Sequence, residues 1–243
     1  MNIVDIITDS LAYPFQNIMA FIVYAILGII AGVAVGGTIV GIVLGTKVNQ
    51  TLTTGIIAVI GIILAIIIAL LISGYELDIV KLGTIRSYES PEIDFVRQVH
   101  NGINLVITKL VYYLIPFIIT LVLSLVLGLF LRNWIVSIIA FIIYVIFAFA
   151  EYMAECRLAK TEELSEALAV GEAINDITRV GVINVVSVTL ILLVISFIIS
   201  LIIFYLMSFG GAIGLLGSIL LGIFAVYFEF VTGRAKGLLY SNA

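Results

Sequence analysis

The chain has 243 residues, of which 63% are hydrophobic and 11% are charged, and its formal net charge is −4. Soluble domains are about 45–50% apolar and roughly 25% charged, so this composition excludes an ordinary soluble fold. One cysteine excludes an intrachain disulfide, and one histidine removes most Ser-His-Asp and zinc chemistry. The acidic balance leaves no basic surface for nucleic acid.

Long apolar runs follow one another along the chain, and each is close to the 20 or so residues that cross a bilayer as a helix. Backbone polar groups in hydrocarbon need internal partners, so unbroken runs of this length predict helices. The runs cover residues 19–44, 55–73, 110–131, 134–150, 181–206 and 210–230. The sequence therefore predicts an all-α membrane protein with six transmembrane helices.

Short turns at residues 45–54, 132–133 and 208–211 join these runs into three hairpins of a single transmembrane domain, residues 1–243. Only two basic residues, Lys47 and Arg132, lie in the turns, and the other nine lie on the opposite side with both termini. The positive-inside rule therefore predicts a multi-pass protein of the cell membrane with both termini cytoplasmic. Asn49 opens a glycosylation sequon in the first outer turn.

Amphipathic segments precede the hairpins and predict helices that lie at the cytoplasmic membrane surface or dock under the bundle. The first covers residues 3–11. The second is expected to start with Ser90 as the N-cap and Pro91 in the first turn, and the third to start at Thr161.

A threefold repeat is one interpretation of this layout, with copies at residues 1–87, 88–160 and 161–243. The basic residues Lys81, Arg157 and Arg234 recur at intervals of 76 and 77 residues and would be equivalent. Copies of two spans each share one orientation, which gives a parallel repeat. The alternative is that any series of cytoplasmic segments and hairpins has this period.

Short motifs outside and at the ends of the spans resemble those of one family. They are residues 1–7 with Tyr13-Pro14-Phe15, then Gly74-Tyr75, and then residues 113–116, 154–158 and 171–174. In these the chain is similar to the domain of unknown function 4013 family, small polytopic membrane proteins found largely in methanogenic archaea. The resemblance implies the span layout and no activity. In that family an Arg commonly follows the Gly-Tyr pair, whereas here the base is delayed to Lys81.

Glycines recur at four-residue spacing in the first span, in a glycine-zipper pattern. A bare backbone stripe lets helices approach closely where lipid gives no hydrophobic drive. The stripe indicates packing against a neighbouring span, or a pore-lining or homo-oligomer helix. Pro116 predicts a kink in the third span. The glycines are Gly28, Gly32, Gly36, Gly37, Gly41 and Gly45.

Glu76, Glu151 and Glu229 lie at the cytoplasmic ends of three spans. One interpretation is ordinary interfacial placement. The other is an acidic ring around a cytoplasmic vestibule, which would attract cations. His100 is expected to be solvated or packed, and Cys156 to be inert.

Two functional classes remain open, and neither needs a catalytic site, metal or cofactor. A membrane enzyme ranks third, because its candidate acids are interpreted more simply as a solvated face, namely Glu155, Glu162, Glu163 and Glu166. A non-catalytic scaffold or subunit is favoured because no charge lies near the centre of a span. It would bind a protein partner at its cytoplasmic helices or a second copy, and it predicts a dry bundle. A small-solute or ion permease instead predicts a hydrated cavity lined by the first-span glycines and the hydroxyls of the fifth span.

Reporter fusions test the six-span topology. A reporter that is active only in the cytoplasm is expected to be active at both ends of the chain. An extracytoplasmic C-terminus would contradict the six-span prediction.

Overall fold

The computed structural model describes residues 2–47, 51–127, 133–209 and 211–242, and this part of the chain is helical and turn structure without strands. Side-chain surroundings are not described for residues 35–54. The helices are α1 (Ile3–Gln16), α2 (Ile18–Lys47), α3 (Thr51–Thr84), α4 (Phe95–Leu127), α5 (Asn133–Thr161), α6 (Leu164–Ala167), α7 (Val170–Val180), α8 (Val182–Ser208) and α9 (Gly211–Tyr240).

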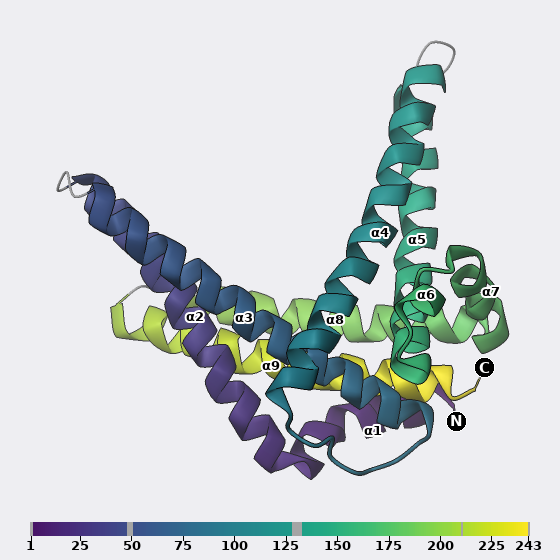
Figure 1. Ribbon diagram of the computed structural model, residues 1–243, viewed down its shortest axis with the longest axis horizontal. Coiled ribbons are helices and arrows are strands. Elements are labelled where there is room, and N and C mark those ends of the chain that lie inside the picture. Colours follow the sequence, from purple (N-terminus) through teal and green to yellow (C-terminus); the bar gives the residue numbers. More distant parts are fainter. Residues whose placement is uncertain (1, 48–50, 128–132, 210, 243) are drawn as a thin grey trace.

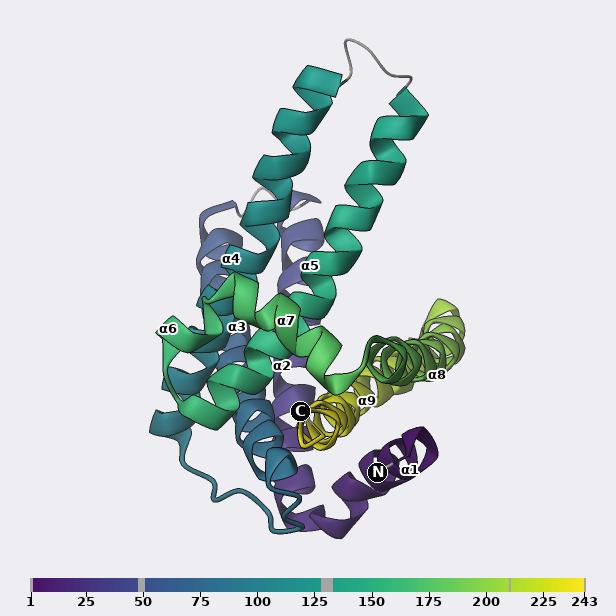
Figure 2. The same ribbon diagram turned by 90° about the vertical axis from the view of Figure 1, so that its right-hand side faces the viewer.

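Three antiparallel pairs, α2–α3, α4–α5 and α8–α9, diverge from a common base that holds both termini (Figure 1). Helices α1, α6 and α7 belong to this base, with α1 beside α9 and α7 beside α5 (Figure 2). Within the described residues, five helices are long and apolar enough to cross a membrane. The number is six if α1 and α2, which meet at 81°, count as one broken span. The all-helical class and a set of five to six helices that could cross a membrane are thus confirmed.

The second amphipathic segment differs from its prediction. Helix α4 starts at Phe95 and runs without a break into the third span. The cap is Asp94, whose carboxylate accepts the backbone N–H groups of Val96 and Arg97 at 3.1 Å each. A carboxylate that accepts two N–H groups at the positive end of the helix dipole is a strong cap, and Ser90 lies outside the helix.

The third segment also differs, because it is not one helix from Thr161. Helix α5 continues through Thr161, and Glu162 then breaks it in a left-handed conformation at φ 60°. Two shorter helices, α6 and α7, follow. The apolar residues keep their helical spacing on both sides of this break, so their spacing could not predict the turn.

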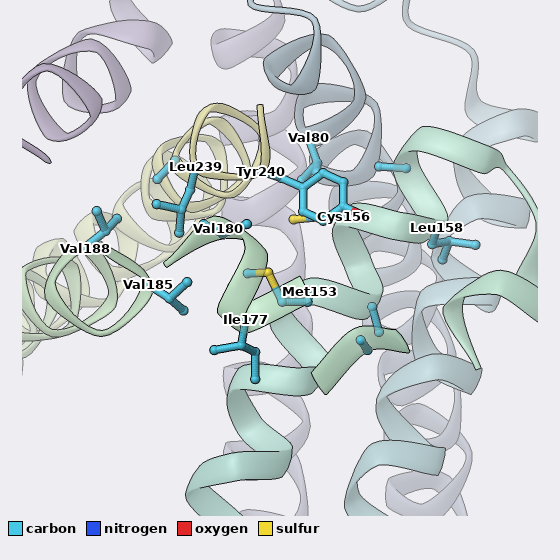
Figure 3. Close-up of a cluster of buried hydrophobic side chains, with 14 of the residues drawn as sticks. Val80, Met153, Cys156, Leu158, Ile177, Val180, Val185, Val188, Leu239 and Tyr240 are labelled. Atoms are coloured by element: carbon cyan, nitrogen blue, oxygen red, sulfur yellow. The ribbon is translucent and has the colours of Figure 1, made fainter. Parts of the chain in front are cut away.

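Apolar side chains from several helices form the core of the base (Figure 3). Met153 and Cys156 of α5 meet Val180 of α7 and Leu239 of α9 there. The amphipathic helices contribute too, with Ile6 of α1 almost fully buried. Their apolar faces therefore contact protein in the base, and a place for them at the membrane surface stays a prediction.

Glycines allow the tightest helix contacts. A Cβ on Gly102 of α4 would lie 2.2 Å from the Leu70 carbonyl oxygen of α3. At the crossing of α2 and α9, a Cβ on Gly28 would lie 2.9 Å from the Gly222 carbonyl oxygen. Gly32 differs, because its Cβ would meet nothing within 4 Å. Gly28 therefore packs within the molecule, while a packing role for Gly32 stays a prediction.

The other predicted features of the spans are not decided by the described residues. The surroundings of Gly36, Gly37, Gly41 and Gly45 lie outside those residues, as do Asn49 and Arg132. Pro116 is buried within α4, which continues on both sides, and its carbonyl accepts the Thr120 hydroxyl at 2.8 Å. A functional kink at Pro116 stays a prediction.

We expect Gly102→Ala to lower the stability of the protein by about 1–3 kcal/mol, because the new methyl group overlaps the α3 backbone. Thermal unfolding of the purified protein in detergent measures this. Gly32→Ala is the matched control and should leave the melting temperature unchanged or raise it, because its methyl group meets open space. Equal melting temperatures for the two variants would contradict the α3–α4 contact.

Candidate functional site

Six charged side chains gather where α3, α4, α5 and α9 enter the base. The spacing of four residues between Glu151 and Glu155, and of seven between Glu229 and Lys236, keeps each pair on one helix face. These faces point to the interior, where α3 adds an acid and α4 adds a base. The cluster consists of Glu76, Lys109, Glu151, Glu155, Glu229 and Lys236.

Lys236 is the centre of the cluster. Its Nζ lies 2.7 Å from Glu76 Oε1 and also bonds Glu155 Oε2, so one ammonium joins α9 to α3 and α5. Lys109 Nζ lies 3.0 Å from Glu155 Oε1. The Glu76 and Glu155 side chains are each only 2% exposed. Buried charges of this kind cost several kcal/mol each in lost hydration, which the pairing has to offset.

The other two acids contact carboxyl groups. Glu229 interacts with the carboxyl group of Glu76, and Glu151 interacts with that of Glu155. Within the described part of the chain, no donor satisfies Glu76 Oε2. Four carboxyl groups thus share two ammonium groups, and the cluster is neutral when two of the carboxyl groups hold protons.

A cleft of about 420 Å³ opens onto the cluster between α8, α9 and the bases of α3 and α4. Glu76, Glu229 and Lys236 line one end. Ser196 and Ser200, which share one face in the middle of α8, line it further along. The cleft, called the polar cleft below, therefore carries polar groups among apolar side chains of α9 from the base toward the middle of the third hairpin.

A second cavity, of about 790 Å³, lies on another side of α9 and is mostly apolar. Gly28 and Gly32 of α2 border it, together with residues of α3 and α9. Glu229 lines this cavity as well as the polar cleft. A solute in either space can therefore reach the Glu229 carboxyl group.

The three acids chosen from the sequence do fall in one cluster, but their arrangement is not an open ring. Lys236 and Glu155 lie between Glu76 and Glu151, so the contacts form a chain. The sequence interpretation of Glu155 as part of a solvated face was wrong, because the residue is 1% exposed. Its spacing from Glu151 was the signal that both belong to the inward face of α5.

The repeat-equivalent bases each pair with an acid, two of them in corresponding places. Arg157 lies 3.1 Å from Asp176 of α7, and Arg234 lies 2.7 Å from Asp9 of α1. Each acid lies four residues after the acid that opens its amphipathic segment, which is Asp5 for α1 and Glu172 for α7. The threefold repeat stays a prediction, to which this correspondence lends support.

The third base, Lys81, lies at the surface and pairs with Glu162. Gln98 occupies the place in α4 that corresponds to Asp9 and Asp176. The hydrogen bond from Lys81, together with its charge, holds the pKa of the Glu162 carboxyl below its usual range. This exposed pair departs from the pattern of the other two bases.

The remaining reactive side chains lie apart from the cluster or take no part in it. Cys156 is buried, and its thiol points to the Lys236 carbonyl at 3.6 Å. His100 is exposed and lies beside Asn104. The described residues bring together no group of three or more side chains of His, Cys, Asp or Glu suited to a metal ion.

Long apolar helical hairpins that meet at a charge cluster are the arrangement expected of a polytopic helical membrane protein. The chain belongs to the family described as Protein of unknown function (DUF4013), whose model matches residues 57–209. The match includes Glu76, Lys109, Glu151 and Glu155, and ends before Glu229 and Lys236. No curated protein and no solved structure matches the chain.

We expect Lys236→Met to destabilise the protein by about 3–5 kcal/mol, because it leaves Glu76 and Glu155 buried without their shared cation. Thermal unfolding in detergent at neutral pH measures the loss. Lys81→Met is the control and should cost about 0–1 kcal/mol, because the Lys81–Glu162 pair is exposed. Equal losses for both variants would show that Lys236 does not hold the base together.

Proposed function

We propose that the protein is a membrane permease for a small solute or ion, with the charge cluster at the cytoplasmic entrance of its path. The observation that carries this proposal is the cleft, which is lined by the carboxyl groups of Glu76 and Glu229 and by the hydroxyl groups of Ser196 and Ser200. Ionisable groups buried at a membrane helix bundle commonly mark ion and solute paths.

The extent of the cleft supports the proposal. Its lining residues on α9 run from Lys236 to Leu221, which spans about 22 Å at 1.5 Å per residue. That distance is a large part of a hydrocarbon core of about 30 Å. Ser196 and Ser200 offer hydrogen bonds along it, so a polar solute does not meet a purely apolar wall.

Buried charge and cavities weigh against the scaffold. It was favoured because no charge lies near the centre of a span and it predicted a dry bundle, whereas Glu76, Glu155 and Lys236 are buried at the ends of the spans and two cavities flank α9. Apolar side chains of similar volume would serve stability alone as well or better. The presence of six charged groups there is better explained by a site that binds or transfers a charged species.

One observation favours the scaffold as the second candidate. The hairpins diverge beyond the base, and only 6% of the most apolar 18-residue stretch of α3 is buried within the molecule (Figure 1). Lipid or a partner subunit would cover these faces. A scaffold would use them as binding surfaces and would not need the cleft.

Flux measurements on proteoliposomes test the proposal. Gradients of protons, Na⁺, K⁺ and methylammonium are imposed one at a time and followed with entrapped indicator dyes or isotopes. The wild-type protein is expected to dissipate at least one gradient faster than protein-free liposomes, and the Glu76→Gln, Glu229→Gln double variant should lose this activity. Glu163→Gln, which changes an exposed acid of the base, is the control and should keep it. Wild-type flux at the level of empty liposomes for all four probes would reject a permease for monovalent cations and favour the scaffold.

A further inference from the structure

One oxygen of the cluster has an unexplained environment. Glu76 is 98% buried, and its Oε1 accepts the Lys236 ammonium and lies 3.4 Å from the Thr232 hydroxyl. Its Oε2 receives no donor within the described part of the chain, although it belongs to a side chain that lines the polar cleft. Its carboxyl group instead interacts with that of Glu229, which lines the same cleft.

The proximity of these two carboxyl groups favours a cation between them. An ionised carboxylate only accepts hydrogen bonds, and a protonated carboxyl group also donates one. Two ionised carboxylates in contact away from water repel each other strongly, so such pairs hold one proton between them. The contact between Glu76 and Glu229 thus becomes a hydrogen bond when one of them is protonated.

The neighbouring charged groups that the structure describes place no other cation between Glu76 and Glu229. Lys236 is shared between Glu76 and Glu155, and Lys109 lies on Glu155. Glu151 faces Glu155 and not the pair, while α8 contributes only Ser196 and Ser200 to this cleft. Neither lysine forms an ion pair with Glu229 within the described residues. Two carboxyl groups are too few for the usual ligand set of a metal ion, but they suffice to hold a proton.

We propose that Glu76 and Glu229 form a proton-binding carboxyl pair whose proton exchanges through the polar cleft. Glu229 is the accessible member, because it lines both the polar cleft and the apolar cavity beside α2. The pair deepens the proposed permease function by naming the proton as the ion that it handles, and in that respect it rests on that function.

A carbodiimide tests the pair directly. The O–H of a protonated carboxyl group adds across a C=N bond of dicyclohexylcarbodiimide, and acyl migration then gives a stable N-acylurea with no leaving group. The apolar cavity of about 790 Å³ gives this apolar reagent a route to Glu229. Full-length protein in lipid nanodiscs is treated at a series of pH values, and the adduct is located by mass spectrometry of its peptides.

We expect the adduct on Glu229, formed more slowly as pH rises. Glu76→Gln should reduce labelling at neutral pH, because the amide N–H₂ of glutamine donates to an ionised Glu229 and removes the need for the proton. Glu163→Gln is the matched control and should leave labelling of Glu229 unchanged. Elution volume and thermal unfolding show that each variant is folded.

Three results would overturn the inference. They are a folded protein with Glu229 unlabelled at every pH, a labelling rate independent of pH, and protection by Na⁺ at constant pH, which would assign the position to a metal cation. Labelling also separates this inference from the proposed function. If Glu229 is labelled as expected and proteoliposomes show no flux, the proton pair stands and the permease fails.

Discussion

The ammonium group of Lys236 connects the three hairpins at the base of the molecule. It bonds acids of α3 and α5 from a position on α9, and so joins one helix from each of the three hairpins. In a medium where apolar faces gain little by meeting each other, polar contacts and close backbone packing have to supply the association between helices. The glycines of the α3–α4 and α2–α9 crossings supply the packing, and the charge cluster supplies the polar contacts.

The same cluster contains more acidic groups than ion pairing alone needs. Purely structural ion pairs would match each ammonium group with one carboxyl group, whereas here four carboxyl groups share two ammonium groups. The surplus lies in Glu229 and Glu151, at the ends of the chain of contacts. Glu229 opens onto two cavities, so the excess acid lies where solutes can reach it. This imbalance is what connects the architecture to the proposed permease.

Hydropathy and loop length predicted the helical membrane class and the order of the apolar helices, because lipid restricts a chain of this composition so strongly. The ends of the spans also indicated Glu76, Glu151 and Glu229. The contacts of Lys236 could not be predicted, because its partners lie 81 and 160 residues away and depend on how each helix is rotated. The sequence did not predict the start of α4 or the break at Glu162, because the ends of helices give only a weak signal in the sequence.

The pairing of Arg234 with Asp9 has a consequence for biogenesis. The arginine is fully buried in the last helix, its partner lies in the first helix, and the Tyr13 ring of that helix stacks on its guanidinium group. Ribosomes deliver the N-terminus first, so α1 must wait with an unmatched acid while the intervening helices enter the bilayer. The base is completed only when the final hairpin arrives, and a chain truncated before Arg234 would expose an unfinished surface that quality-control proteases can recognise.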